Sequence, residues 1–150
     1  MVFLLYMKED LLFKPSPDLQ KIMTAEKAVE SNFIEIINSK NENDIVGVIY
    51  RHPTSNPNSF IESHLKPLLE EKLSKDILNK TVYLAGDFNF DLTNVSHQIT
   101  SDFFDTMTTN QMLPTIYLPT KLNRIHNTLH DNIFTNQFNP YIISGNYTNI

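Results

Sequence analysis

One apolar run that ends in polar residues constrains this chain more than any other stretch. Residues 81–85 read Thr-Val-Tyr-Leu-Ala, and Gly86, Asp87, Phe88 and Asn89 follow. The β-branched and aromatic members predict a buried strand, which Gly86 ends. Because Asp87 and Asn89 are two apart, we expect both to point to one side of the chain while Phe88 points away. A carboxylate and a carboxamide should then converge on one small volume.

These two side chains suit metal or phosphate chemistry. A carboxylate can hold a hard divalent cation or take a proton from water, and an amide can donate to or accept from a phosphate or a metal-bound water. A surface turn is the alternative, because Gly, Asp and Asn are common turn residues. The two residues by themselves favour the turn, so the rest of the chain must decide.

Several blocks of the chain resemble one family in their order and spacing. Residues 86–89 (GDFN) resemble the signature of the endonuclease/exonuclease/phosphatase superfamily, whose fold is that of pancreatic deoxyribonuclease. Residues 46–53 (VGVIYRHP) resemble the strand and loop GVIYRPP in the endonuclease domain of LINE-type, non-LTR retrotransposon polyproteins. Residues 119–120 (PT) and 128–136 (TLHDNIFTN) resemble two further segments of that group. The agreement indicates the superfamily and favours its retroelement branch.

The resemblance implies an α+β fold. A deoxyribonuclease-like domain is a four-layer α/β sandwich, in which two mostly antiparallel sheets stack and helices cover their outer faces. Residues 1–150 are expected to form one partial domain of this kind, incomplete at both ends. The family's upstream Asn and Glu and its terminal Ser-Asp-His segment have no counterpart in the sequence.

β-rich runs predict strands in the first third of the chain. The expected strands are residues 1–7, 11–13, 31–37 and 45–50. The first two should form one hairpin, and the last two should form a second, antiparallel hairpin. Residues 15–30 have no clean period, and we expect a loop there with one helical turn near residues 25–29. Glu30 and Glu35 are not expected to bind metal, because the family's metal-binding Glu lies further upstream. Glu35 should lie on the solvated face of its strand.

Helical spacing of apolar residues marks two segments. Residues 59–78 predict an amphipathic helix packed on a sheet, capped by Asn58 or Ser59 and kinked or divided at Pro67. His64, beside its apolar stripe, is expected in the core or at its boundary. The second expected helix is residues 100–110, with Phe103, Phe104 and Met107 facing inward. An extended stretch is expected at residues 116–120.

The resemblance implies catalytic roles for four residues. Asp87 would orient the attacking water or transfer a proton, and Asn89 would position the phosphate and a metal ion. Tyr50 would donate a hydrogen bond to a phosphoryl oxygen, and Asp131 would orient a catalytic histidine. None of the chain's five histidines stands at that histidine's position. From residue type alone, Tyr50 would be a half-buried aromatic at the sheet edge and Asp131 an exposed turn residue.

The expected cofactor is Mg²⁺ or Mn²⁺, held by Asp87 and Asn89 with the remaining ligands outside this chain. Phosphate and DNA contacts are expected from four residues, one by resemblance and three because positive charge clusters in their loops. The first is Thr120, and the others are Arg51, Lys121 and Arg124, with His52 and His126 beside them. For Lys121 and Arg124, ordinary solvated loop charge is the alternative.

Composition sets the outer bounds. The 150 residues are 41% hydrophobic and 19% charged, which is typical of one globular domain. A net charge of -5 disfavours a protein that simply coats DNA, but it disfavours a metal-dependent nuclease less, because a bound cation offsets acidic residues. The absence of cysteine excludes disulfides and thiolate zinc sites and fits an intracellular setting. No apolar run approaches the length of a transmembrane helix.

The expected activity is endonucleolytic nicking of DNA, leaving a 3′ hydroxyl that primes reverse transcription. The implied partners are DNA and a reverse transcriptase domain of the parent polyprotein, with no membrane, and the implied location is nuclear. This chain alone is expected to be inactive or nearly so. The alternatives are another phosphoesterase of the same superfamily and a non-catalytic remnant that binds nucleic acid or a partner through a sheet edge.

Overall fold

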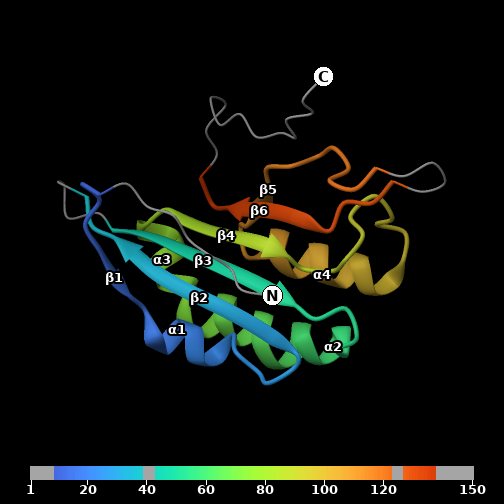
Figure 1. Ribbon diagram of the computed structural model, residues 1–150, viewed down its shortest axis with the longest axis horizontal. Coiled ribbons are helices and arrows are strands. Elements are labelled where there is room, and N and C mark those ends of the chain that lie inside the picture. Colours follow the sequence, from blue (N-terminus) through green and yellow to red (C-terminus); the bar gives the residue numbers. More distant parts are fainter. Residues whose placement is uncertain (1–8, 39–42, 123–126, 138–150) are drawn as a thin grey trace.

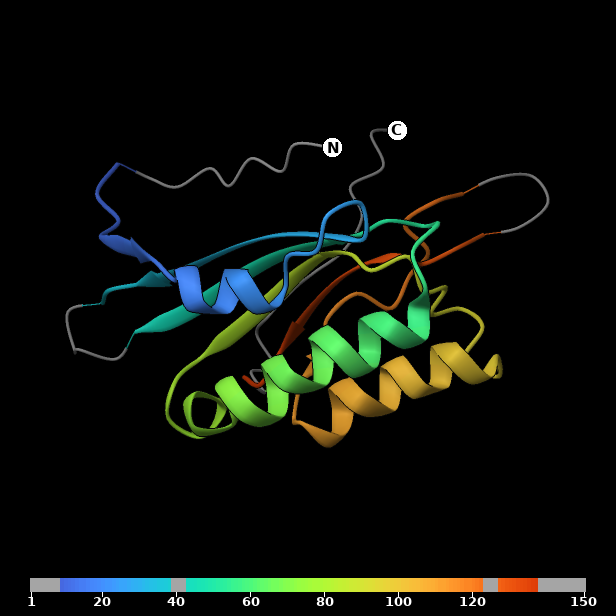
Figure 2. The same cartoon turned by 90° about the horizontal axis from the view of Figure 1, so that it is seen from below.

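One mixed sheet with helices on one face forms the body of the protein (Figures 1 and 2). The computed structural model describes residues 9–38, 43–122 and 127–137. The strands are β1 (Phe13–Pro15), β2 (Val29–Ile36), β3 (Asp44–Arg51), β4 (Val82–Asp87), β5 (Leu113–Pro114) and β6 (Asp131–Thr135). The helices are α1 (Pro17–Ile22), α2 (Pro57–Phe60), α3 (Ser74–Asn79) and α4 (Gln98–Thr109), and two π-helical segments, Ile61–Leu65 and Pro67–Lys72, connect α2 to α3.

The sheet has the strand order β1-β2-β3-β4-β6-β5. β2 and β3 form an antiparallel hairpin, which confirms the pairing predicted for residues 31–37 and 45–50. β3 and β4 are parallel, and the helical residues between them provide the crossover that a parallel pair needs. β4 pairs antiparallel with β6, and β6 with β5. The described residues thus form an α+β structure with one sheet of the expected sandwich.

Burial alternates along the strands. In β3, Ile45 and Ile49 pack fully into the core beneath the helices, whereas Val48 and Tyr50 are half-buried. Because neighbouring strand residues point to opposite faces, the sheet has a helix-covered face and a second face that carries Tyr50. None of the helices described for this chain is long and apolar enough to cross a membrane.

An aromatic cluster joins the residues after β4 to α4. Phe90 stacks on Phe103 with ring centroids 4.3 Å apart, and Phe88 meets Phe134 edge to face at 5.5 Å. Large buried rings contribute much of a small core's burial free energy. The segment after Asp87 is therefore anchored through the side chains at positions 88 and 90.

The long helical segment confirms the predicted amphipathic helix and its division at Pro67. It begins at Pro57, and the N-cap is Asn56, whose side chain accepts from the N–H of Ser59 at 3.0 Å, so the expected caps were wrong. Proline has no N–H to donate and its ring crowds the preceding turn. On both sides of Pro67 the backbone bonds reach five residues back, as from Leu73 N–H to the Leu68 carbonyl at 2.8 Å.

The second helix, α4, and the partly buried position of His64 are close to the prediction. α4 buries Phe103 and Met107, but Phe104 is only half-buried, because it lies one position round the helix from the core-facing stripe. Thr100 and Thr106 occupy the remaining buried positions. His64 is partly buried, and its Nδ1 lies 2.7 Å from the Ile22 carbonyl oxygen.

The N-terminal part differs from expectation. A helix covers Pro17–Ile22 where a loop was predicted, with proline at its start and Asp18 in its first turn, both favourable there. Residues 25–29, predicted as a helical turn, instead make a β-bridge between Ala25 and Val29. β1 pairs with β2, and the hairpin partner predicted at residues 1–7 lies outside the described residues.

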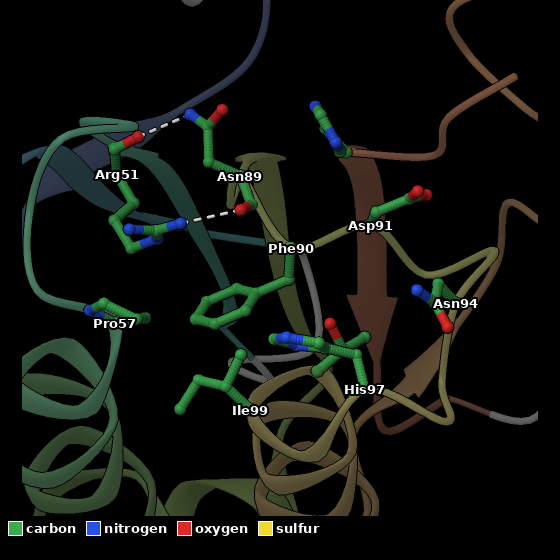
Figure 3. Close-up of a pocket in the computed structure, with 10 residues that line it drawn as sticks. Arg51, Pro57, Asn89, Phe90, Asp91, Asn94, His97 and Ile99 are labelled. Carbon is green, nitrogen blue, oxygen red and sulfur yellow. Dashed lines mark hydrogen bonds between the residues drawn. The ribbon is translucent and has the colours of Figure 1, made fainter. Parts of the chain in front are cut away.

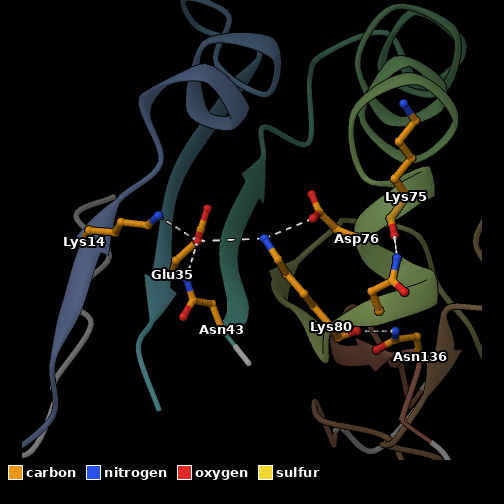
Figure 4. Close-up of polar contacts among 8 residues, drawn as sticks. Lys14, Glu35, Asn43, Lys75, Asp76, Lys80 and Asn136 are labelled. Atoms are coloured by element: carbon orange, nitrogen blue, oxygen red, sulfur yellow. Dashed lines mark hydrogen bonds and ion pairs between the residues drawn. The ribbon is translucent and has the colours of Figure 1, made fainter. Parts of the chain in front are cut away.

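Glu35 is paired rather than simply solvated (Figure 4). Its Oε2 lies 3.1 Å from Lys14 Nζ, accepts from Asn43 Nδ2 at 2.9 Å and lies 3.9 Å from Lys80 Nζ, which pairs in turn with Asp76 at 3.0 Å. Burial raises the pKa of Glu35, but the hydrogen bonds from Asn43 and Lys14 and the charge of Lys80 outweigh it and lower the pKa below its ordinary value. These contacts connect β1, β2 and α3.

Gly86 allows β4 to lie close to β3. It remains in the ladder, opposite Ile49 and Asn132, so the strand runs one residue further than predicted. Its φ is +151°, and a Cβ atom there would lie 1.8 Å from the Ile49 carbonyl oxygen. Only glycine fits this position, and the next residues in register are Tyr50 and Asp87.

We predict that Gly86→Ala lowers the free energy of unfolding by about 3 kcal/mol or more, because it adds a steric clash to an unfavourable φ. Urea denaturation followed by circular dichroism measures the change. Ala85→Gly in the same strand is the control and should cost only about 0.5–1 kcal/mol. Equal losses in the two variants would contradict the steric explanation.

Candidate functional site

One row of side chains crosses four strands where β4 ends. Glu30 on β2 is opposite Tyr50 on β3, Tyr50 is beside Asp87 on β4, and Asp87 is opposite Asp131 on β6. Directly opposed residues in a sheet point to the same face. This is the face away from the helices, because the preceding residue Ile49 is in the core. The structure therefore brings Tyr50, Asp87 and Asp131 together from three strands.

Asp87 is half-buried in this row, and its pKa is raised above the ordinary value. Burial is the largest cause; the N–H of Asn89 acts in the opposite direction, and the charge of Asp131 raises the pKa further. His130 and Arg51 lower it by smaller amounts. Two carboxylates on adjacent strands repel each other, so the pair favours a bound proton or cation. This is the environment of a general base or of a metal ligand.

Asn89 reaches the site through a turn. Its φ is +53°, a left-handed conformation that Asn tolerates better than most residues, so the strand alternation predicted for residues 87–89 stops at Asp87. The Asn89 N–H donates to Asp87 Oδ1 at 3.0 Å, and Nδ2 donates to the Arg51 carbonyl at 2.6 Å. Since Nδ2 faces that carbonyl, Oδ1 points away from Arg51 (Figure 3). That oxygen is the ligand atom Asn89 can offer.

Arg51 is placed differently from a phosphate-binding arginine. It is only 4% exposed, on the helix-covered side of the sheet, and lies over the Phe90 ring at 4.5 Å. Nε donates to the Phe88 carbonyl at 2.7 Å, Nη2 to the Asn89 carbonyl at 2.6 Å, and Nη1 to the Ser55 carbonyl at 3.1 Å. Burial lowers the pKa of Arg51, and Asp87 partly offsets this. The geometry favours a structural role for Arg51 over the expected phosphate contact.

The other expected phosphate contacts precede β6. The backbone N–H groups of Thr120 and Lys121 both donate to the Thr128 carbonyl, at 3.0 and 3.1 Å. These bonds join the segments on the two sides of residues 123–126. Lys121 is exposed, and the Thr120 hydroxyl is buried without a hydrogen-bond partner within the described residues. Arg124 and His126 lie outside the described residues.

A cavity of about 240 Å³ opens beside this end of the sheet, between the loop after β4 and the start of α4 (Figure 3). Its lining residues are Arg51, Pro57, Asn89, Phe90, Asp91, Asn94, His97, Ile99, Thr100 and His130. Arg51 and Asn89 form part of its wall. Hydrogen bonds between these two residues join the loop after β3 to the loop after β4. The cavity therefore adjoins the site through Asn89.

Two asparagines of the downstream motif were not identified from the sequence. Asn132 is 2% exposed, and its Nδ2 donates to the Ile116 carbonyl at 2.9 Å. Asn136 accepts from the Val82 N–H at 2.8 Å and donates to the Ile77 carbonyl at 2.6 Å. Their place within and directly after the β-rich run of β6 was the available signal, because a buried amide needs partners. Both hold neighbouring segments to β6.

The donor atoms at this end of the sheet suit a hard cation. Carboxylate oxygens of Asp87 and Asp131 and Oδ1 of Asn89 are the ligand type that Mg²⁺ prefers. Within residues 9–38, 43–122 and 127–137, however, no three His, Cys, Asp or Glu side chains lie close enough together to hold a metal ion. A magnesium ion held by Asp87 and Asn89 stays a prediction.

A solved structure with this architecture is the endonuclease domain of TRAS1, a telomere-specific non-LTR retrotransposon. It aligns with a TM-score of 0.57 and 14% identity over 83% of this chain and 54% of that domain. This chain has the deoxyribonuclease-like fold. It spans about half the length of the TRAS1 domain, and the likeness shows the fold alone. The expected fold class is confirmed.

Two further structures align less well. They are endonuclease/exonuclease/phosphatase family proteins from Bacteroides thetaiotaomicron, with a TM-score of 0.45 and 16% identity over 72% of this chain and 40% of that one, and from Leptotrichia buccalis, with 0.40 and 19% over 71% and 41%. No family model and no curated protein matches the sequence.

We predict that Arg51→Lys destabilises the fold by about 3 kcal/mol, because a lysine cannot satisfy the several carbonyls that the guanidinium bonds. Thermal and urea unfolding measure the loss. The control, Lys121→Arg, is the reverse substitution at an exposed position. It should change the free energy of unfolding by no more than about 0.5 kcal/mol. An Arg51→Lys variant of unchanged stability would contradict the structural role.

A second prediction concerns Asp87 and acidity. Since the folded state raises the pKa of Asp87, the charged carboxylate destabilises the fold at pH values above that pKa, and the neutral acid does not. In metal-free buffer, Asp87→Asn should therefore raise the urea midpoint at neutral pH, by a small amount because solvent screens a half-exposed group. The gain should fade as the pH falls through about 4, the ordinary pKa of an aspartate, because the carboxyl then becomes neutral in both states.

The control for that prediction is Asp105→Asn, which removes an exposed carboxylate of α4. It should leave the urea midpoint unchanged across the same pH range. A destabilised Asp87→Asn protein at neutral pH would show that the carboxylate is favourably paired in the fold.

Proposed function

We propose that this chain belongs to a divalent-metal-dependent endonuclease domain that hydrolyses phosphodiester bonds in DNA and nicks a target site for a retrotransposon. The observation that carries the proposal is the row of Tyr50, Asp87 and Asp131 on three adjacent strands of a deoxyribonuclease-like sheet, at the end where β4 stops. Polar groups that converge at the end of buried strands are held rigidly enough for catalysis. DNA as the substrate is supported by the endonuclease character of the TRAS1 domain, which shares this fold.

The chemistry proposed is in-line hydrolysis. A water molecule attacks phosphorus, the bond to the 3′ oxygen breaks, and that oxygen leaves as a 3′ hydroxyl after gaining a proton. Asp87, half-buried at the end of β4, orients the water or takes its proton. The Tyr50 hydroxyl donates to a phosphoryl oxygen as charge develops, which can be worth about 3 kcal/mol in the transition state.

Asp87 and the Oδ1 of Asn89 would hold Mg²⁺ or Mn²⁺, with further ligands from residues beyond this chain. The bound ion supplies positive charge against the phosphate. Asp131 would accept a hydrogen bond from a histidine of a further segment and fix its tautomer. Thr120 and Lys121 remain proposed phosphate contacts, and the parent polyprotein would carry a reverse transcriptase and act in the nucleus.

We predict that the chain extended at both ends along its source gene nicks supercoiled plasmid DNA in Mg²⁺, whereas this chain alone is inactive or nearly so. Asp87→Ala in the extended chain should lower the nicking rate by about 10²-fold or more, because it removes a catalytic carboxylate. Gel electrophoresis of relaxed against supercoiled plasmid measures the rate, and EDTA should abolish it.

Asp105→Ala is the matched control, an exposed aspartate on α4 that should leave nicking unchanged. A folded extended chain that does not nick would refute the nuclease proposal. The alternative, a remnant that only binds nucleic acid or a partner, would then be favoured. Hydrolysis of a phosphoinositide or sphingomyelin in place of DNA would instead favour another phosphoesterase of the superfamily.

A further inference from the structure

A histidine and a glutamate lie beside Tyr50. His52 Nε2 is 3.0 Å from Glu30 Oε1, and the His52 ring meets the Tyr50 ring at a centroid distance of 4.8 Å and an angle of 66°. Glu30 is also the direct cross-strand partner of Tyr50. The three side chains therefore form one connected group, with the imidazole in contact with both a carboxylate and a phenol.

The backbone around this group is fixed from both sides. The His52 N–H donates to the Ala28 carbonyl at 2.9 Å, which continues the pairing with the β2 side beyond the end of β3. The intervening Arg51 is held in the core by its carbonyl contacts. His52 lies two residues after Tyr50, so its side chain is on the same face.

The imidazole itself is oriented by these contacts. In the neutral ring, the nitrogen nearest a carboxylate carries the proton, so Nε2–H donates to Glu30 and the tautomer is fixed. The His52 and Glu30 side chains are 28% and 43% exposed, so the pair lies at the surface beside the row rather than beneath it. The edge-on ring contact restricts the swing of the Tyr50 ring.

We propose that Glu30 and His52 are positioning residues that hold the Tyr50 hydroxyl at the phosphoryl oxygen. The inference rests on the proposed nuclease function. A hydrogen-bond donor stabilises a transition state only if it is already in place, and small displacements of such groups reduce rates strongly. The motif that this stretch resembles has proline where this chain has His52, so the pair is a feature of this sequence.

The test is a double-mutant cycle on the extended chain, measured by plasmid nicking. His52→Gln and Glu30→Gln should each lower kcat about tenfold with little change in KM, as removal of an orienting partner does. In a Tyr50→Phe background, His52→Gln should have no further effect, because the hydroxyl that it positions is absent. His64→Gln, which alters a partly buried histidine on the helical side, is the control and should leave kcat unchanged.

The state of the imidazole is read separately in this chain by ¹⁵N NMR. We expect the proton on Nε2 in the unchanged protein and a redistribution between the two nitrogens in Glu30→Gln. The positioning role is overturned if His52→Gln leaves kcat normal. It is also overturned if His52→Gln lowers kcat as much in the Tyr50→Phe background as in the unchanged extended chain. A rise in KM alone does the same, since it would mean direct contact with DNA.

The two proposals fail in distinguishable ways. If the extended chain nicks DNA and the His52 and Glu30 variants behave like His64→Gln, only the positioning role is refuted. If the unchanged extended chain is folded and does not nick, the nuclease proposal is refuted and the positioning role is refuted with it.

Discussion

The buried guanidinium of Arg51 fixes the geometry on which the rest of the site depends. It donates to the Phe88 and Asn89 carbonyls, while Asn89 Nδ2 donates back to the Arg51 carbonyl, so the ends of β3 and β4 are joined in both directions. A charge buried this deeply is tolerated only because its donors meet polar acceptors. The consequence is that Tyr50 and Asp87, which precede the two loops, keep a fixed relation to each other. The geometry of the candidate site on this face thus depends on packing on the opposite face.

Local patterns in the sequence predicted the elements that bury a regular stripe. The β2–β3 hairpin, the long helix with its break at Pro67 and the strand leading to Asp87 all follow from periodicity or from the chemistry of proline. The six residues of α1 place only Leu19 and Ile22 against the core, which is too short a stripe to predict a helix. Pro17 beside Asp18 was interpreted as a break, although proline suits a helix start. The start of the long helical segment at Pro57 is likewise set by one side chain, that of Asn56.

Long-range contacts account for what the sequence did not predict at the site. Two carbonyl partners of Arg51, those of Phe88 and Asn89, lie 37 and 38 residues away, and no local pattern distinguishes its buried position from a solvated loop arginine. The alignment of Tyr50, Asp87 and Asp131 depends on the pairing of three strands, and only the resemblance to a known family suggested it. Resemblance could not supply the contact between His52 and Glu30, because it depends on side chains particular to this chain.

The strand order also sets a sequence of events during synthesis. β2, β3 and the crossover helix can assemble as soon as β4 leaves the ribosome, but β4 then remains an open edge until β6 arrives, more than forty residues later. An unpaired edge strand is prone to pair with other chains. Asp131 begins the strand that closes this edge, so the second carboxylate joins the first only when the nascent sheet is protected from aggregation. Slow folding is expected for such non-local pairing, and the acidic pair is the last part of the row to form.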